Sequence, residues 1–149
     1  MTEIVDSQLP LTVKEVEDVE LKLGYELPSE YRIFLQKTNG GIPKPDAVKH
    51  EGEYWDYVAY FYAVRNGLYA DDLFRNLEEY REIVPSHYLP IGESPGGNLY
   101  CLSLKNKDFG AVYFWDHDEA NYDGEPWEEN MTLLAKSLSE FTEGLYVEK

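Results

Sequence analysis

The chain of 149 residues has one cysteine, Cys101, and only 13 lysines and arginines against 29 aspartates and glutamates. A lone cysteine cannot form a disulfide within the chain, which is typical of proteins from a reducing cytoplasm. The sequence also lacks any apolar run near the roughly 20 residues that cross a bilayer. Its first residues lack the basic and apolar segments of a secretory signal. We therefore expect a cytoplasmic protein without a membrane partner.

The shortage of basic residues indicates which kind of partner the chain can bind. The formal net charge of −16 argues against nucleic acid as a ligand, because lysine and arginine are the residues that neutralise phosphates. Hydrophobic residues make up 43% of the chain and aromatic residues 15%, which excludes a disordered chain. The length fits a single domain over residues 1–149. We expect this domain to bind a basic protein, and the composition leaves open whether it is a monomer or a weak dimer.

Two helices are predicted in the first part of the chain. Thr12 and Glu15 have the spacing of a capping box, in which each side chain bonds the backbone N–H of the other residue. Gly24 provides the stop signal of this helix. Pro28 suits the start of the second helix because its missing N–H would have no helical partner. The Asn-Gly-Gly sequence at residues 39–41 supplies the left-handed residues that end it.

Beyond a proline-containing loop predicted at residues 42–45, strand and helix patterns alternate. Aromatic and β-branched residues predict strands at 54–64 (one or two strands), 88–92, 98–104 and 110–116. Apolar residues at helical spacing predict helices at 72–83, with Asp71 or Asp72 as the cap, and at 131–145, with Asn130 as the cap. Turn residues between the last three strands favour an antiparallel meander. The order of the elements predicts an α+β fold, a predominantly antiparallel β-sheet flanked by α-helices.

The segment from Asp116 to Glu129 holds seven acids and no lysine or arginine. A hard-cation site is one interpretation, but the spacing of an EF-hand fails because Asn121 stands where glycine is needed. A solvated loop and a protein-binding surface both remain open, the second because Trp127 and Tyr122 could anchor a partner within a ring of charge. The candidate contact residues are Asp118, Glu119, Tyr122, Asp123, Glu125, Trp127, Glu128 and Glu129.

A second acidic and aromatic stretch lies at residues 51–57 and continues with the aromatic residues Tyr60, Phe61 and Tyr62. Alternate residues of a strand face opposite sides, so about half of its aromatic rings must pack into the core. The other half must meet a helix or a partner, and tyrosine and tryptophan are favoured at protein interfaces. The candidate contact residues here are Glu51, Glu53, Tyr54, Trp55 and Asp56.

The sequence offers no motif for catalysis. It lacks a Gly-x-Ser-x-Gly nucleophile elbow, a zinc-binding His-Glu-x-x-His and a phosphate-binding Gly-Lys-Ser/Thr. His117 lies between Asp116 and Asp118, but neighbours on a strand point to opposite faces, so these three side chains are not expected to converge. Cys101 lies among apolar residues and is predicted to be a small buried hydrophobe. We assign no catalytic residue, metal ligand or cofactor, and we expect no enzyme.

Residues 27–41, LPSEYRIFLQKTNGG, resemble the signature of the SUKH superfamily, which reads Leu-Pro, an aromatic residue, Phe-Leu and then Asn-Gly-Gly. That superfamily comprises bacterial immunity proteins and fungal regulators of killer-toxin resistance and cell-wall assembly. Residues 133–145 resemble its last helix, although Leu138 takes a place often held by phenylalanine. Three further stretches are similar to its central strands, at residues 89–92, 97–102 and 110–118.

The resemblance implies the SUKH (SMI/KNR-like) fold and a non-enzymatic immunity protein. Such a protein binds and neutralises a polymorphic toxin, often a nuclease, in the bacterial cell that produces it, and the toxin is encoded nearby. A nuclease presents a basic cleft for phosphate, which an acidic face would match. The alternative is a cytoplasmic regulatory or scaffold module like the fungal members. Because toxin-contacting residues vary across the superfamily, only charge and aromatic content nominate the candidates above.

Overall fold

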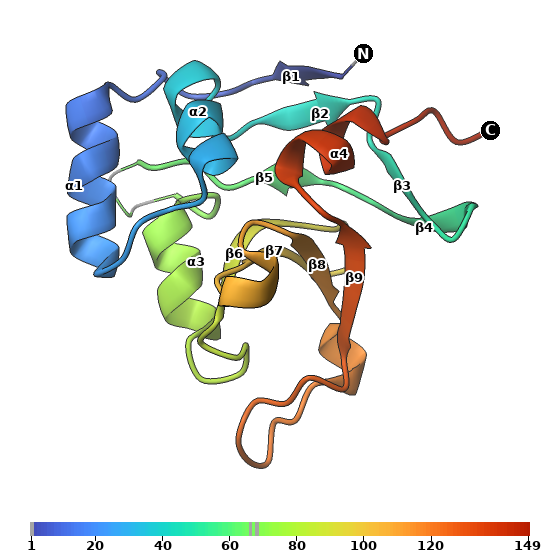
Figure 1. Ribbon diagram of the computed structural model, residues 1–149. Coiled ribbons are helices and arrows are strands. Elements are labelled where there is room, and N and C mark those ends of the chain that lie inside the picture. The colour runs from blue at the N-terminus through green and yellow to red at the C-terminus, as the bar shows by residue number, and fades with distance from the viewer. Residues whose placement is uncertain (1, 66, 68) are drawn as a thin grey trace.

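The computed structural model describes residues 2–65, 67 and 69–149 (Figure 1). Its helices are α1 (Val13–Leu23), α2 (Ser29–Lys37), α3 (Leu73–Tyr80) and α4 (Leu138–Glu143). Its strands are β1 (Glu3–Val5), β2 (Ile42–Lys44), β3 (Ala47–His50), β4 (Glu53–Tyr57), β5 (Tyr60–Phe61), β6 (Tyr88–Glu93), β7 (Leu99–Ser103), β8 (Val112–Trp115) and β9 (Met131–Ala135). Short 3₁₀ turns, η1 (Asn106–Asp108) and η2 (His117–Glu119), lie on either side of β8.

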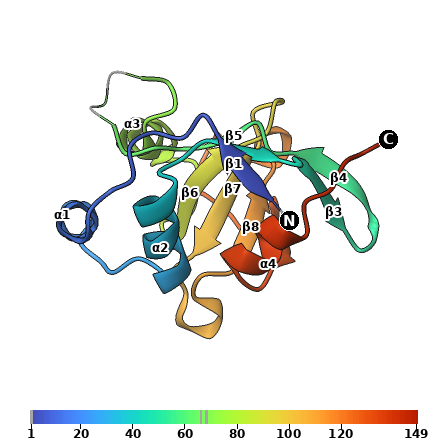
Figure 2. The same cartoon turned by 90° about the horizontal axis from the view of Figure 1, so that it is seen from above.

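A five-stranded antiparallel sheet forms the centre of the fold, in the order β5-β6-β7-β8-β9. β1 pairs with β2, and β3 pairs with β4, in two further antiparallel ribbons. α2 and α4 lie on the same side of the sheet (Figures 1 and 2), where Tyr31 and Phe141 join the main hydrophobic core. These observations confirm the predicted α+β fold with a predominantly antiparallel sheet.

The opposite face of the sheet carries a second, smaller core. Its buried members are Val84, Tyr88, Leu99, Cys101 and Trp115. Cys101 is fully buried, as predicted, and burial raises the pKa of its thiol. Ala120 and Met131, which lie near the two ends of the acidic segment, pack against the same cluster. Apolar side chains near both ends of the acidic segment therefore pack against the sheet.

The signals at the ends of α1 and α3 act as predicted. Thr12 and Glu15 form the capping box of α1, and Gly24 ends that helix in the left-handed region with a φ of 89°. At the start of α3 the side chain of Asp72 accepts a hydrogen bond from the backbone N–H of Arg75. Each cap satisfies a backbone donor that has no partner inside the helix.

The Asn-Gly-Gly turn after α2 is required by packing as well as by conformation. Gly40 has a φ of 78°, and a Cβ at this position would lie 2.7 Å from the Cβ of Ala63. The buried side chain of Asn39 accepts from the Val64 N–H (2.8 Å) and donates to the Leu9 carbonyl (2.9 Å). The turn thus joins three separate segments of the chain.

The predicted helix over residues 131–145, capped by Asn130, is wrong in its first half. Residues 131–135 form strand β9, which pairs with β8, and the helix α4 begins only at Leu138. Ser137 provides the cap, accepting from the Glu140 N–H. The apolar residues pack into the core in either conformation, so their spacing alone could not separate a strand from a helix. Residues 131–135 form a strand because the edge of β8 is free to pair with them.

Three strands near the N-terminus were not predicted, namely β1, β2 and β3. The prolines at residues 42–45 favoured a loop, but Pro43 lies in β2, where it pairs with Ile4 of β1. Prolines in sheets are found mainly in edge strands, and both strands of a two-stranded ribbon are edge strands. Among the described residues, the helices are all too short and too polar to cross a membrane.

Candidate partner-binding surface

The acidic segment projects from one end of the central sheet, between β8 and β9 (Figure 1). All eight candidate residues predicted in this segment have exposed side chains. Tyr122 is 57% exposed and Trp127 is 38% exposed, although both are large apolar residues. An exposed aromatic ring among carboxylates is available to a partner without any rearrangement of the core.

Hydrogen bonds within the acidic segment hold its two aromatic rings. The Tyr122 hydroxyl donates to the His117 carbonyl (2.8 Å), and the Trp127 indole N–H donates to the Glu119 carbonyl (2.9 Å). At the base of the segment, the side-chain amide of Asn130 donates to the backbone carbonyl of the residue that follows β8 (3.0 Å). These bonds fix the segment through its own side chains, because it has no sheet ladder of its own.

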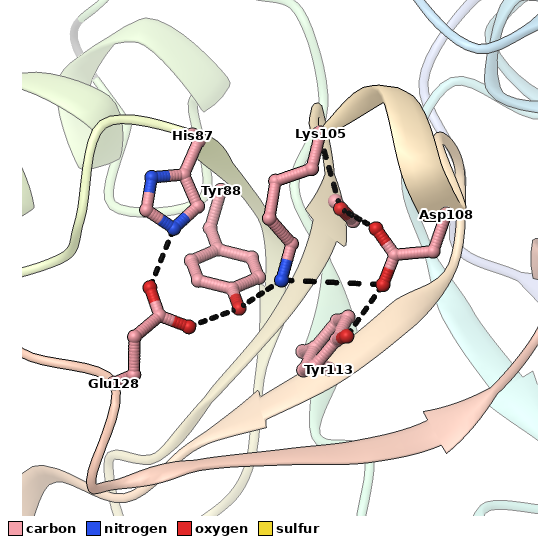
Figure 3. Close-up of polar contacts among 7 residues, drawn as sticks. His87, Tyr88, Lys105, Asp108, Tyr113 and Glu128 are labelled. Carbon is pink, nitrogen blue, oxygen red and sulfur yellow. Dashed lines mark hydrogen bonds and ion pairs between the residues drawn. The ribbon is translucent and has the colours of Figure 1, made fainter.

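Glu128 has a different role from the other acids of the segment. Its carboxylate accepts a hydrogen bond from the Tyr88 hydroxyl (2.6 Å) and bonds the ring Nε2 of His87, both at the start of β6 (Figure 3). Lys105 donates to the same Tyr88 hydroxyl (2.9 Å) and extends the network toward Asp108. Glu128 therefore fastens the acidic segment to the sheet.

The electrostatics of this network favour an ionised Glu128. Partial burial pushes the pKa of its carboxyl upward, but the hydrogen bonds from Tyr88 and His87 outweigh burial and hold that pKa below its usual value. The pKa of Tyr88 is raised, first by burial and then by its bond to Glu128. No local pattern in the sequence indicates this network, because Glu128, His87 and Lys105 lie on segments that are far apart in the chain.

The prediction that Asp116, His117 and Asp118 cannot converge is wrong. Their ligand atoms lie within 4.8 Å of one another, because β8 ends at Trp115 and the next residues form the 3₁₀ turn η2 rather than a continued strand. One carboxylate oxygen of Asp116 already accepts the Asp118 N–H (3.0 Å). We interpret this group as part of the framework of the turn.

The candidates on the β3–β4 hairpin divide into two sets. Glu51, Glu53 and Tyr54 are exposed. Trp55 is half-buried, and its ring packs edge-on against Phe114 with centroids 5.4 Å apart. The expectation that about half of these aromatic rings pack inward is met by Trp55, Phe61 and Tyr62, of which the last two are buried, while Tyr54 is exposed. Trp55 therefore contributes more to the core than to a surface.

Asn98, in the turn between β6 and β7, links the two candidate segments. Its amide oxygen accepts from the backbone N–H of His117 (3.0 Å), and its amide nitrogen donates to the carboxylate of Asp56 on the hairpin (3.4 Å). The structure thus brings the hairpin and the acidic segment to the same end of the sheet. The sequence did not predict this contact, since Asn98 was interpreted only as a residue of the turn and of the start of the strand that follows.

A groove with a volume of about 680 Å³ runs beside the acidic segment. One wall is formed by residues 122–126 of that segment, and the other by residues 81–87, which connect α3 to β6. The second wall was missed by sequence reasoning, because the two stretches are far apart in the chain and neither carries a signal of their contact.

The comparisons with known proteins agree with this fold. The sequence model of the SMI1 / KNR4 family (SUKH-1) matches residues 10–144, and the chain belongs to this family. It is 27% identical over 148 residues to the SPbeta prophage-derived uncharacterized protein YokK of Bacillus subtilis (strain 168), covering 87% of this chain and 72% of that protein. A protein of Pseudomonas syringae pv. tomato has a crystal structure similar in fold, with a TM-score of 0.50, 18% identity, and coverage of 80% of this chain and 81% of that one.

Proposed function

We propose that this chain is a non-enzymatic immunity protein that binds and neutralises a basic toxin, of nuclease type, in the bacterial cell that produces it. The observation that carries the proposal is the acidic segment itself, a fixed projection with exposed carboxylates and two exposed aromatic rings. Membership of the SMI1 / KNR4 family (SUKH-1) supports it. The prophage origin of the Bacillus relative favours a bacterial setting over that of the fungal regulators.

Charge gives the proposal its physical basis. A net charge of −16 attracts a basic cleft over a long range and raises the rate of encounter. Carboxylates on a projecting loop imitate the phosphates that a nuclease cleft binds. The rings of Tyr122 and Trp127 supply apolar area that slows dissociation once contact is made.

The proposal includes the absence of catalysis. We expect the purified protein to show no nuclease, protease or phosphatase activity, and chelator treatment to leave its melting temperature unchanged. A reproducible rise of several degrees on addition of calcium or zinc would contradict this expectation and return attention to the turn at Asp116–Asp118.

The direct test is survival of cells that co-express the chain with the toxin-like domain encoded beside it. Under the proposal the wild-type chain protects these cells. A variant with Asp118, Glu119, Asp123, Glu125 and Glu129 changed to their amides protects them less. Failure of the wild-type chain to protect would overturn the proposal. Full protection by the variant would remove the acidic segment from the interface and leave the Glu51–Asp56 stretch as the next candidate.

A further inference from the structure

The groove between residues 81–87 and 122–126 combines three features that suit one kind of ligand. Ile83, Pro85 and Pro126 provide apolar lining, and Tyr122 adds an aromatic residue to the wall. Glu82 and Glu125 also line it. An apolar lining, an aromatic face and carboxylates match the aliphatic stem, the planar cation and the hydrogen-bond donors of an arginine side chain.

The carboxylates of Glu82 and Glu125 are available for such a ligand. Within the described part of the chain, neither side chain makes a hydrogen bond or an ion pair. The cationic side chains that line the groove already have acidic neighbours, since Arg81 lies 3.4 Å from Glu78 and His87 bonds Glu128. The groove therefore has an excess of negative charge that its own residues do not neutralise.

The walls of the groove are held in place before any ligand arrives. The Tyr122 hydroxyl is bonded to a backbone carbonyl (2.8 Å), and the side-chain amide of Asn121 donates to the carbonyl of Glu125 (2.8 Å). Glu128 ties the same segment to His87, at the end of the opposite wall. A groove that is already ordered loses little conformational entropy on binding.

We propose that this groove binds an arginine side chain of the toxin, with its guanidinium against the ring of Tyr122 and between the carboxylates of Glu82 and Glu125. The inference rests on the proposed function and names the residue type of the partner. Arginine suits the groove better than lysine, because a planar guanidinium stacks on an aromatic ring and can reach two carboxylates at once.

A second groove also has a volume of about 680 Å³, so volume alone does not identify a groove that binds arginine. It lies between the end of α1, α3 and the start of β6, and its lining includes Leu23, Phe74 and Leu77. Its charged lining residues are Lys22, Glu78 and Arg81, so it has no excess of negative charge. This second groove serves as an internal control for arginine binding.

The experiment is an NMR titration of the whole ¹⁵N-labelled chain with N-acetyl-arginine N-methylamide. The neutral isostere is N-acetyl-citrulline N-methylamide. We expect saturable shifts of the amides of residues 82–84, 86–87 and 122–125 with the arginine probe, and none with citrulline. The double variant Glu82→Gln/Glu125→Gln should weaken binding by about tenfold or more, because both charge-assisted contacts are lost. Tyr122→Leu should weaken it less.

The matched control is the double variant Glu17→Gln/Glu143→Gln, which removes the same charge from exposed positions on α1 and α4. It should bind the probe as the wild type does. Equal shifts with citrulline, shifts spread over all acidic segments, or equal weakening by the control would each overturn the proposal. Shifts at the groove that depend on protein concentration without a probe would assign it to a second copy of the chain, which also overturns it.

Failure of this proposal and failure of the proposed function can be distinguished. If the chain protects cells from the toxin but the arginine probe does not bind in the groove, only the assignment of the groove is wrong. If the probe binds but the chain does not protect, the immunity function is wrong and the groove is an arginine site for another basic protein.

Discussion

The acidic segment and the β3–β4 hairpin have similar compositions but are built in different ways. The hairpin is held by a backbone ladder with an irregularity between Val48 and Lys49, and one of its aromatic rings, that of Trp55, is used by the core. The acidic segment has no ladder, and the polar atoms of its rings bond its own backbone.

The difference shows what backbone pairing does to an acidic and aromatic sequence. A strand must place alternate side chains on opposite faces, so part of its apolar content is always directed inward. A loop that is fixed by side chains has no such constraint and can expose both rings. The exposure of both rings of the acidic segment therefore depends on this construction as well as on composition.

The largest expected effect concerns the core that supports both regions. Phe141 of α4 is buried and packs against Tyr100, and the chain after α4 pairs with the hairpin through Ala47 and Tyr146. Phe141→Asp should lower the free energy of unfolding by about 3 to 5 kcal/mol, because it buries an unpaired charge, and Leu138→Asp should act in the same way. Urea unfolding measures this loss. An unchanged midpoint would mean that α4 is not docked, and Glu143→Gln on its exposed side is the control.

A matched pair of tryptophan substitutions compares the two regions directly. Trp55→Ala should lower the free energy of unfolding by about 2 kcal/mol, because the half-buried ring leaves a space beside Phe114. Trp127→Ala removes an exposed ring with one hydrogen bond and should cost less than about 1 kcal/mol. Urea unfolding of both variants checks the order. Equal losses would show that the acidic segment is as much a part of the core as the hairpin is.

The next effect concerns binding rates with the neighbouring toxin. The five-residue amide variant of the acidic segment should associate about tenfold more slowly, and raising the salt concentration should slow the wild type toward the same rate, because exposed charges act mainly on encounter. Tyr122→Ala and Trp127→Ala should instead speed dissociation. Surface plasmon resonance separates the two rates. Unchanged rates in all three variants would place the interface elsewhere.

The smallest effect concerns the attachment of the acidic segment. Because the pKa of Glu128 is lowered in the folded state, its bonds stabilise the fold above the ordinary carboxyl pKa and are lost as pH falls through the lowered value. Glu128→Gln should therefore reduce the melting temperature by a few degrees at pH 7, and this difference from the wild type should shrink toward pH 3. Thermal unfolding across that range measures it. Glu129→Gln, which removes the same charge from an exposed neighbour, should show no such loss at pH 7.

Local chemistry let the sequence predict much of the fold. The capping box of Thr12 and Glu15, the cap at Asp72 and the turn at Asn39–Gly41 each depend on residues within a few positions of one another. The three strands over residues 88–116 were predicted for the same reason, since alternation and turn residues are local. The exposure of the acidic segment also follows from local composition, because seven acids within fourteen residues, with no lysine or arginine among them, are too costly to bury.

Only the tertiary structure decided the features that depend on distant partners. Residues 131–135 form a strand because the edge of β8 is free to pair with them. Their apolar pattern alone does not indicate this pairing. Glu128 attaches the acidic segment to the sheet because folding brings its carboxylate to His87 and Tyr88. Residues 81–87 became a wall of the groove because the chain places them opposite Tyr122. In each case the deciding contact joins segments well separated in the sequence, and a local pattern carries no information about such a contact.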